Sequence, residues 1–464
     1  MTNVVKRKVV FYFPWREVSG GPYYLTRLAD KLAENSSFEV YYTDYEKGLS
    51  DKLLKNPLVK KIEVGEHDFG IHMDNEPVLL ITPIYWACWL PSMHPDSKIL
   101  FFNWHNSCIS VLKKVWDINN KLITDFLRIV KSTNSVFFAD YSHRMAQNTK
   151  NIIFDECYVP VVMKRKSKFA SSKLVKIGEI NIAVLGRLCL DKIYSIIDLL
   201  NHFNRLDFFS KKHIYIIGSG EDKEKIHPND FPNLIIHFMG TVTSNKLDEF
   251  LSTKVDVLFA MGTSILEGAA IKLPSVIIPH NVVPFTCNKY VYLQDTIKYC
   301  LGWFDTQIEE LNLNTRSLKE IIEDIYIRNQ KKKLGEDAYK YFIKNHTIES
   351  VIGNLTDAMK RTSFTYRDFK IFNNKINNMY RKCKRWKVMG VSIVTLFKNR
   401  DNDIRINIFN IIPLLYYKQS KERKTKILYF WKIPLLTFTN KKNGSVVKVN
   451  VTFILKIIKW IKGR

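Results

Sequence analysis

The chain is 464 residues long, and its content of 46% apolar and 13% aromatic residues excludes wholesale disorder. Its formal net charge of +26 would fit nucleic acid or an anionic membrane as a partner, but the charge is uneven along the chain. Arg367–Arg464 contains 24 Lys and Arg against 4 Asp and Glu, a net of +20, which leaves +6 for everything before it. The chain therefore divides into a long part of ordinary charge and a basic tail.

The spacing of the cysteines and the lengths of the apolar runs indicate which compartment the protein occupies and whether it can span a membrane. The 7 cysteines are scattered and include no CxxC pair, so neither a disulfide framework nor a zinc site is expected, and a reducing cytoplasm fits. The N-terminal apolar run Val9–Phe13 is too short for a signal peptide and is typical of a buried strand. No apolar run reaches the ~18–20 residues that a membrane-spanning helix needs. We expect a chain that can lie on a membrane without crossing it.

In the first half of the chain, short apolar runs alternate with helical patterns, as expected for parallel βα units. The predicted strands are Val9–Phe13, Phe38–Tyr42, Val78–Thr82, Ile99–Asn103, Val136–Ala139 and Cys157–Val162. Apolar residues at helical spacing predict an amphipathic helix over Tyr23–Asn35. A basic, polar stretch, Lys164–Lys176, then predicts a linker.

The same pattern restarts after this linker. The predicted strands are Ile180–Gly186, Ile214–Ile217, Leu234–His237, Val255–Phe259 and Ser275–Pro279, and the predicted helices are Ile196–Phe203, Leu318–Asn345 and Ile348–Lys360. Two consecutive blocks predict an α/β fold with two doubly wound sheets facing each other. We expect domains at residues 1–163 and 179–345, a linker at 164–178, a closing helix at 346–365 and the basic tail at 366–464. Ligands of such folds bind outside the carboxyl ends of the strands, so the residues just after each strand are the candidates for a site.

The tail contains a degenerate repeat. Phe409–Leu415 recurs 21 residues later as Phe430–Leu436, with weaker echoes at Val388–Phe397 and Val447–Ile454. Each unit is a short β-like apolar run flanked by basic residues, which predicts a small repetitive β-structure. Acidic lipid attracts basic residues near its surface, so we expect the tail to hold the protein on the cytoplasmic face of the membrane. The alternative is a basic appendix that packs on the other domains or on another subunit.

Two cations follow the first strand of the second block. Arg187 and Lys192 would emerge at the carboxyl end of that strand and the start of the next helix, where a fork and a point charge can pair a diphosphate. The alternative is a solvated pair in a basic protein. Gly218 and Gly220 end another strand and would let a ligand approach the backbone, although a simple turn explains them equally well.

The segment from Val255 to Pro279 carries the strongest signal. A strand runs into Gly262, Thr263 and Ser264, whose backbone N–H groups and hydroxyls would open a helix and form an anion site. Glu267 could accept hydrogen bonds from a ribose diol. The alternative is that Thr263 or Ser264 is only an N-cap, with Glu267 closing a capping box.

His105 lies in a polar and aromatic cluster, Trp104–Asn106, directly after a predicted strand, where catalytic groups belong. A hydrogen-bonded loop histidine is the alternative, and His143 is a weaker candidate. No DxD pair lies where it could bind a metal together with a phosphate, so we expect no metal and no cofactor. Arg187 and Lys192 would neutralise a leaving diphosphate instead.

Over residues 1–365 the sequence resembles the group-4-like glycosyltransferases of the GT-B type. The motifs in matching order are Gly20–Gly21, Gly186–Leu188 with Lys192, Gly218–Gly220, Phe238–Val242 and Glu267–Pro279. The resemblance implies two Rossmann-like domains facing a cleft and a nucleotide-sugar donor.

The resemblance also implies roles for single residues. Arg187 and Lys192 would hold the donor pyrophosphate, and Glu267 would hold the nucleotide ribose. Gly20–Gly21 would lie under the donor phosphates. His105 matches the position of a histidine near the transferred sugar.

The sequence departs from this family at two places. The family usually carries two glutamates eight residues apart, and the earlier place is Phe259 here; Ile193 follows Lys192 where glycine is common. The Met261–Glu267 form is similar to a subgroup associated with bacterial surface polysaccharides. The missing glutamate leaves open how the sugar is held.

The sequence therefore predicts a hexosyltransferase-type glycosyltransferase of bacterial lipopolysaccharide or capsule biosynthesis. Its partners would be a nucleotide-diphosphate sugar, a saccharide or lipid-linked acceptor, and an anionic membrane surface, with no nucleic acid. The alternatives are a GT-B scaffold without turnover, a nucleotide-sugar epimerase and, less favoured because no nucleic-acid motif is present, a nucleic-acid-binding protein.

Overall fold

The computed structural model describes residues 6–16, 20–65, 75–116, 118–149, 151–166, 178–207 and 211–379, together with seven strands of the tail. The chain forms two compact units, Met1–Tyr366 and Arg367–Arg464. The first unit contains two parallel sheets, and the second contains an antiparallel sheet.

The first sheet has the strand order β3-β2-β1-β4-β5-β6, and all its pairs are parallel. Its strands are β1 (Arg7–Tyr12), β2 (Phe38–Tyr45), β3 (Lys60–Val64), β4 (Leu79–Pro83), β5 (Lys98–Asn103) and β6 (Val136–Phe138). The helices between them are α1 (Gly20–Leu32), α2 (Ser50–Leu53), η1 (Ile84–Trp89), α3 (Cys108–Trp116), α4 (Asn120–Ser132) and α5 (Tyr141–Gln147). The central strands are continuous apolar runs because helices cover both faces of a parallel sheet.

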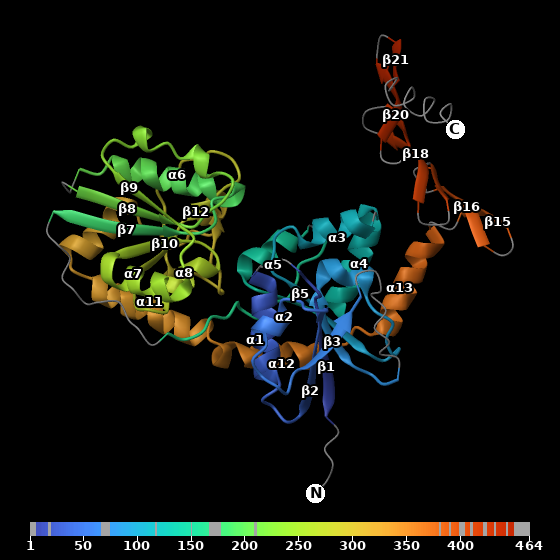
Figure 1. The fold of residues 1–464 in the computed structure, drawn as a ribbon, viewed down its shortest axis with the longest axis horizontal. Helices are drawn as coiled ribbons and strands as arrows, with labels where there is room; N and C mark the ends of the chain where they lie inside the picture. Colours follow the sequence, from blue (N-terminus) through green and yellow to red (C-terminus); the bar gives the residue numbers. More distant parts are fainter. Residues whose placement is uncertain are drawn as a thin grey trace, which may run out of the picture. The chain divides into compact units, whose positions relative to one another are not determined.

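The second sheet repeats this topology, with the order β13-β11-β10-β7-β8-β9. Its strands are β7 (Glu179–Leu185), β8 (Lys211–Ile217), β9 (Ile235–Gly240), β10 (Val257–Ala260), β11 (Ser275–Ile277) and the antiparallel β13 (Val291–Tyr292). The helix α6 (Leu190–Asn204) covers one face of the sheet, and α7 (Ser244–Lys254), α8 (Thr263–Ala269) and α11 (Lys331–Asn345) cover the other (Figure 1). Both sheets therefore have the doubly wound order 3-2-1-4-5-6.

Shorter elements complete the second domain. They are η2 (Lys223–Lys225), η3 (Pro228–Asp230), β12 (Pro279–His280), η4 (Leu293–Asp295), β14 (Trp303–Phe304), α9 (Asp305–Glu310), α10 (Leu318–Ile322) and η5 (Glu323–Ile327). The strands β12 and β14 form a small parallel pair.

The chain then returns to the first domain. The helix α12 (Ile348–Arg361) contacts α1, and Thr362 donates its hydroxyl to the Ile99 carbonyl. The Ile99 N–H donates to the Phe364 carbonyl, and the Tyr366 N–H donates to the Ser97 carbonyl. Phe364 is fully buried. Residues up to Tyr366 are thus part of the first domain's fold.

The second unit is a seven-stranded antiparallel meander in which each strand pairs with the next. Its strands are β15 (Lys382–Val388), β16 (Val391–Lys398), β17 (Ile404–Ile408), β18 (Ile412–Ser420), β19 (Thr425–Phe430), β20 (Ile433–Lys441) and β21 (Gly444–Val449). The helix α13 (Tyr366–Met379) precedes them. No helix in the described ranges is long and apolar enough to cross a membrane.

The predicted α/β class with two doubly wound domains is confirmed, and three details are wrong. Cys157–Val162 is not a strand, since only an isolated bridge joins Tyr158 to β6. The edge strand β3 was not predicted, because three of the five residues in Lys60–Val64 are charged. The helix predicted over Leu318–Asn345 is interrupted by a π-helical turn and by Asn329 in the left-handed region. Most of the predicted linker, residues 167–177, lies outside the described residues.

Candidate functional site

Both parallel sheets have a topological switch point, where the strand order reverses. In the first sheet it lies between β1 and β4, and in the second between β7 and β10. Ligands of doubly wound folds bind in the crevice outside the carboxyl ends of the strands at this point. The predicted residues Gly20 and Gly21 follow β1, Arg187 and Lys192 follow β7, and Gly262 and Thr263 follow β10.

A cavity of about 540 Å³ is lined by residues that follow β1, β4, β5 and β6 of the first domain and β10 of the second, whereas Arg187 and Lys192 after β7 do not line it. The first domain supplies Phe13, Trp15, Gly20, Gly21, Tyr85, Trp104, His105, Asp140 and His143, and the second supplies Gly262, Thr263, Glu267 and Leu301. The cavity therefore brings together six of the predicted site residues, namely Gly20, Gly21, His105, Gly262, Thr263 and Glu267.

Aromatic rings dominate the wall from the first domain. Trp104 packs edge-on against Phe13 with ring centroids 5.4 Å apart, and Phe13 stacks on Trp15 at the same separation. A Cβ atom on Gly21 would lie 2.1 Å from the Trp104 ring, so only glycine fits beneath the indole. In this structure Gly21 therefore makes room for a tryptophan side chain, and Gly20 has nothing within 4 Å of its Cβ position.

His105 lies on this wall in the loop between β5 and α3. Its Nδ1 accepts the Ser107 backbone N–H at 3.2 Å and lies 2.8 Å from the Ser107 hydroxyl. Burial lowers the pKa of His105, the nearby His143 lowers it further, and Asp191 of the second domain opposes both effects. The ring is thus held neutral and faces groups from both domains.

Asp140 and His143 lie beside it at the junction of β6 and α5. Asp140 is the N-cap of α5 and accepts the His143 backbone N–H at 2.9 Å. The imidazole Nδ1 of His143 also lies 2.7 Å from the Asp140 carboxylate, off the ideal line for a hydrogen bond. Asp140 is buried, with 6% exposed, whereas the His143 side chain is 23% exposed at the edge of the cavity.

Glu267 projects from α8 on the opposite wall. Lys166, at the start of the interdomain segment, forms ion pairs with both Glu267 and Asp248. Burial lowers the pKa of the Arg27 guanidinium of the first domain. The nearby Glu267 carboxylate raises the pKa of Arg27, but by less than burial lowers it. The predicted carboxylate is therefore in the cavity and already carries a cationic partner.

The capping-box alternative for this segment is wrong. Gly262, with φ of 63°, occupies the N-cap position of α8, and no side chain caps the helix. Ser264 is the second helical residue and does not line the cavity. The Gly262 N–H donates to the Leu301 carbonyl at 2.7 Å, and α8 has only 7 residues, so the backbone here offers less to an anion than the sequence pattern suggests.

Arg187 and Lys192 lie at the β7 end of the second domain. Neither forms an ion pair within the described part of the chain, and Arg187 is exposed. Lys192 passes close to Gly186 and to His280, which the sequence did not single out. Burial lowers the pKa of His280 to about 4 against the opposing effect of Asp191, and Lys192 acts in the same direction as burial.

Gly218 and Gly220 have a packing role. A Cβ on Gly218 would lie 1.9 Å from the Gly186 carbonyl oxygen, and one on Gly220 would lie 2.1 Å from the Leu188 carbonyl oxygen. Gly218 also has φ of +135°, which side chains rarely adopt. These glycines press the β8 loop against Gly186–Leu188 and so set the position of Arg187.

Phe259, the residue at the place of the family's first glutamate, lies inside β10. Its ring is fully buried and meets the Tyr290 ring edge-on at 5.7 Å. This position therefore belongs to the core. In the described ranges no group of three or more His, Cys, Asp and Glu side chains could hold a metal ion.

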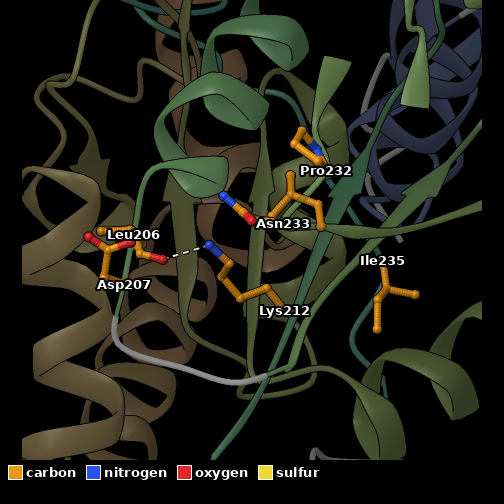
Figure 2. Close-up of a pocket in the computed structure, with 7 residues that line it drawn as sticks. Leu206, Asp207, Lys212, Pro232, Asn233 and Ile235 are labelled. Carbon is orange, nitrogen blue, oxygen red and sulfur yellow. Dashed lines mark hydrogen bonds between the residues drawn. The ribbon is translucent and has the colours of Figure 1, made fainter. Parts of the chain in front are cut away.

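A second cavity, of about 400 Å³, lies at the opposite edge of the second sheet (Figure 2). Lys212 lines this cavity, and its ammonium group donates to the carbonyls of Phe203, Asn204 and Leu206 at the end of α6. All three N–H donors are thus used to cap a helix. This cavity is a structural feature and not a candidate site.

Sequence reasoning missed several groups at the first cavity. Asp140 comes shortly after the strand β6, so its position after an apolar run could have identified it. Trp15 and Tyr85 have no periodic signal, and Lys166 reaches Glu267 only through the tertiary fold.

The chain matches no protein-family model and no curated protein. Among solved structures it is similar to apo lipopolysaccharide outer core galactosyltransferase WaaB, with 11% identity over 76% of this chain and 99% of that chain and a TM-score of 0.47. It is similar to trehalose-6-phosphate synthase OtsA, with 11% identity over 76% and 99% and a TM-score of 0.47. It is also similar to an α-glucosyltransferase solved with UDP and a 13-mer DNA, with 9% identity over 77% and 100% and a TM-score of 0.44.

Proposed function

We propose that this protein transfers a glycosyl group from a nucleotide-diphosphate sugar to a saccharide or lipid-linked acceptor. The observation that carries the proposal is the cavity lined by residues that follow the switch-point strands of two doubly wound sheets. A nucleotide can bind at the switch point of one sheet. The switch point of the other sheet, across the same cavity, then offers a binding surface for a second substrate.

The donor would bind mainly to the second domain. Arg187 and Lys192 have no carboxylate partner among the described residues and are available to a diphosphate. Thr263 would contribute a hydroxyl and Gly262 a close backbone approach, with Gly218 and Gly220 shaping the neighbouring loop. Glu267 would accept the ribose hydroxyls, with Lys166 fixing its carboxylate.

The acceptor would bind against the first domain. Trp15, Tyr85 and Trp104 supply aromatic surface on which sugar rings can pack, and Gly20–Gly21 gives the donor phosphates room at the start of α1. His105 would contact the transferred sugar with the ring nitrogen that Ser107 leaves unused.

Membrane attachment through the tail is part of the proposal. Its support is the net charge of +20 in Arg367–Arg464 and the register of the meander. In the register of these strands Ile404 pairs with Tyr417, Tyr417 with Leu428, Leu428 with Leu436 and Leu436 with Val449, so one row of paired residues is apolar in sequence. Apolar sequence in a strongly basic unit fits an anionic bilayer on the cytoplasmic side.

The biological setting is a further part of the proposal. A hexosyl donor and bacterial lipopolysaccharide or capsule as product rest on the sequence resemblance of the Met261–Glu267 segment. A protein of this setting would meet a lipid-linked acceptor at the membrane surface, which agrees with a basic tail.

Binding of nucleoside diphosphates tests the site. Arg187→Ala and Lys192→Ala should each weaken UDP, GDP or ADP by ~1.5–3 kcal/mol, about 10–150-fold in Kd by isothermal titration. Lys254→Ala is the matched control. Lys254 is an exposed lysine at the end of α7, just before β10 begins, whereas the proposed site lies beyond the carboxyl ends of the strands. The site assignment is wrong if both variants bind like the control.

Two alternative functions predict different products from the same substrates. An epimerase would change the sugar without releasing nucleoside diphosphate, and a scaffold would bind the donor and leave it intact. The buried Phe259 is the observation in favour of a scaffold, because it removes one carboxylate that the family uses. Mass spectrometry of a nucleotide-sugar panel after incubation separates the three.

A further inference from the structure

Two histidines on the first domain face the same cavity with opposite hydrogen-bonding patterns. His105 and His143 both line it, and they are close enough for the charge of His143 to lower the pKa of His105. Which nitrogen of each ring carries the proton follows from the partner of its Nδ1.

His105 presents a donor to the cavity. Its Nδ1 accepts a hydrogen bond from the Ser107 backbone N–H, so in the neutral ring the proton lies on Nε2. His105 has no carboxylate partner on its own loop, because its Nδ1 contacts are both with Ser107. It suits hydrogen-bond donation to a substrate oxygen and not proton uptake.

His143 presents an acceptor. Its Nδ1 is buried and lies 2.7 Å from the Asp140 carboxylate, in a contact whose direction is outside that of a hydrogen bond. Because a carboxylate oxygen can only accept, this close contact favours the tautomer with the proton on Nδ1 and the lone pair on Nε2. The side chain is still 23% exposed although its Nδ1 is buried, and it lines the cavity. A carboxylate behind an imidazole also stabilises the imidazolium that forms when the ring takes a proton.

The second domain holds this junction in place. The Tyr141 N–H donates to the Lys298 carbonyl at 3.1 Å, and the Ser142 hydroxyl donates to Gln307 at 3.4 Å. Tyr141 and Trp303 rings lie 6.1 Å apart. The Asp140–His143 turn is therefore anchored directly against the domain that would bind the donor.

We propose that His143 is the proton acceptor of the transfer reaction, with Asp140 as its positioning residue. The inference rests on the proposed function. The acceptor O–H bond breaks and its proton goes to Nε2 of His143. The oxygen forms the new bond to the anomeric carbon, and the bond from that carbon to the diphosphate breaks with its electron pair on the phosphate oxygen.

Water can replace the unknown acceptor in the test. Full-length protein is incubated with UDP-glucose, UDP-N-acetylglucosamine and GDP-mannose, and the release of nucleoside diphosphate is measured. His143→Gln should lower this rate by about 100-fold or more, the usual contribution of a general base, with the donor Kd unchanged. Imidazole in the buffer should restore release to His143→Ala, which a packing role would not allow.

Two further variants complete the design. Asp140→Asn keeps an N-cap residue of equal quality for α5 but removes the carboxylate, so release should fall while the thermal midpoint holds. His94→Gln is the matched control, because His94 also neighbours an aspartate, Asp96, on the same domain but lies outside the cavity. It should release nucleoside diphosphate at the parent rate.

The assignment of His143 is wrong if His143→Gln releases nucleoside diphosphate at the parent rate. It is also wrong if His143→Ala loses this release and imidazole does not restore it. In both cases the proposed function still stands. A parent protein that binds no nucleoside diphosphate contradicts the proposed function itself, and this inference falls with it.

Discussion

The charged residues that we propose for donor binding differ in whether they already have an ion-pair partner. Glu267 has a cationic partner in Lys166, whereas Arg187 and Lys192 have no carboxylate partner among the described residues. Like-charged groups without a counter-ion are disfavoured unless a ligand neutralises them. At the residue scale, the site is prepared for an anion beside Arg187 and Lys192 and for hydroxyl groups beside Glu267.

Glu267→Gln tests the second half of that statement. The amide has one acceptor oxygen where the carboxylate has two, and it carries no charge. The Kd of UDP, GDP or ADP should therefore rise about 10-fold, while free pyrophosphate should bind as to the parent. Asp248→Asn removes the other partner of Lys166 without altering a cavity residue, and its affinities should match the parent. Equal losses in both variants would mean that Lys166, and not Glu267, determines binding.

Gly218 and Gly240 test the packing of the β8 loop. Both have positive φ, but a Cβ on Gly218 would meet the Gly186 carbonyl at 1.9 Å, whereas one on Gly240 would meet nothing within 4 Å. Gly240→Ala should therefore cost only about 1–2 kcal/mol of backbone strain, and Gly218→Ala about 1–3 kcal/mol more from overlap. Urea midpoints measure the difference, and equal midpoints would contradict the packing role.

At the element scale, the return from the second domain to the first depends on a buried histidine between α11 and α12. His346 is fully buried, and its Nδ1 lies 2.9 Å from the carbonyl oxygen of Val161 on the first domain. The Tyr24 hydroxyl and the Arg27 guanidinium bind the neighbouring carbonyls of Val159 and Val162. These contacts hold the extended segment that the sequence predicted as a strand.

This histidine makes stability depend on pH. Burial lowers the pKa of His346 to about 4, so between pH 6.5 and about 4 the unfolded chain binds a proton that the folded chain does not. Stability from the neutral ring is present above pH 6.5 and is lost as the pH falls through this window, by up to about 3 kcal/mol. The advantage of the parent over His346→Gln in urea unfolding should shrink accordingly, and a constant difference would contradict this account.

The elements were predictable where one physical pattern dominated. Val9–Phe13 and Val255–Phe259 are apolar runs long enough to identify central strands. His105 and Arg187 each follow a parallel strand, His105 in the first sheet and Arg187 in the second, and ligands bind outside the carboxyl ends of such strands. The edge strand β3 was missed because one side of an edge strand is exposed and tolerates Lys60 and Glu63. Tertiary contacts such as Lys166 with Glu267 leave no local pattern, so the sequence could not show them.

At the scale of the whole molecule, the basic charge and the proposed site lie in different compact units. The first unit contains both parallel sheets and the cavity, and the second contains the meander. Attachment to a surface and sugar chemistry are therefore separable by experiment. The fully buried Phe364 sets the limit, because a chain cut before it would lose part of the first domain's core.

A chain ending at Met379 retains α13 and lacks β15–β21. It should bind nucleoside diphosphate like the full chain but no longer sediment with vesicles that contain anionic lipid. The full chain should leave such vesicles as salt rises, because attraction between exposed charges is screened over about 8 Å at physiological ionic strength. Equal sedimentation of the two chains, or tighter binding of the full chain to nucleic acid than to lipid, would contradict the membrane role.

The most direct test of glycosyl transfer is the release of nucleoside diphosphate from a nucleotide-sugar, followed by mass spectrometry with the parent and with Arg187→Ala/Lys192→Ala. The account predicts that at least one donor loses its sugar, to water or to an added acceptor. The double variant should release at least about 100-fold less nucleoside diphosphate at subsaturating donor, in line with two lost charged contacts. Lys254→Ala should release as much nucleoside diphosphate as the parent. Release by the double variant at the parent rate, or an intact donor throughout the panel with the parent protein, would contradict it.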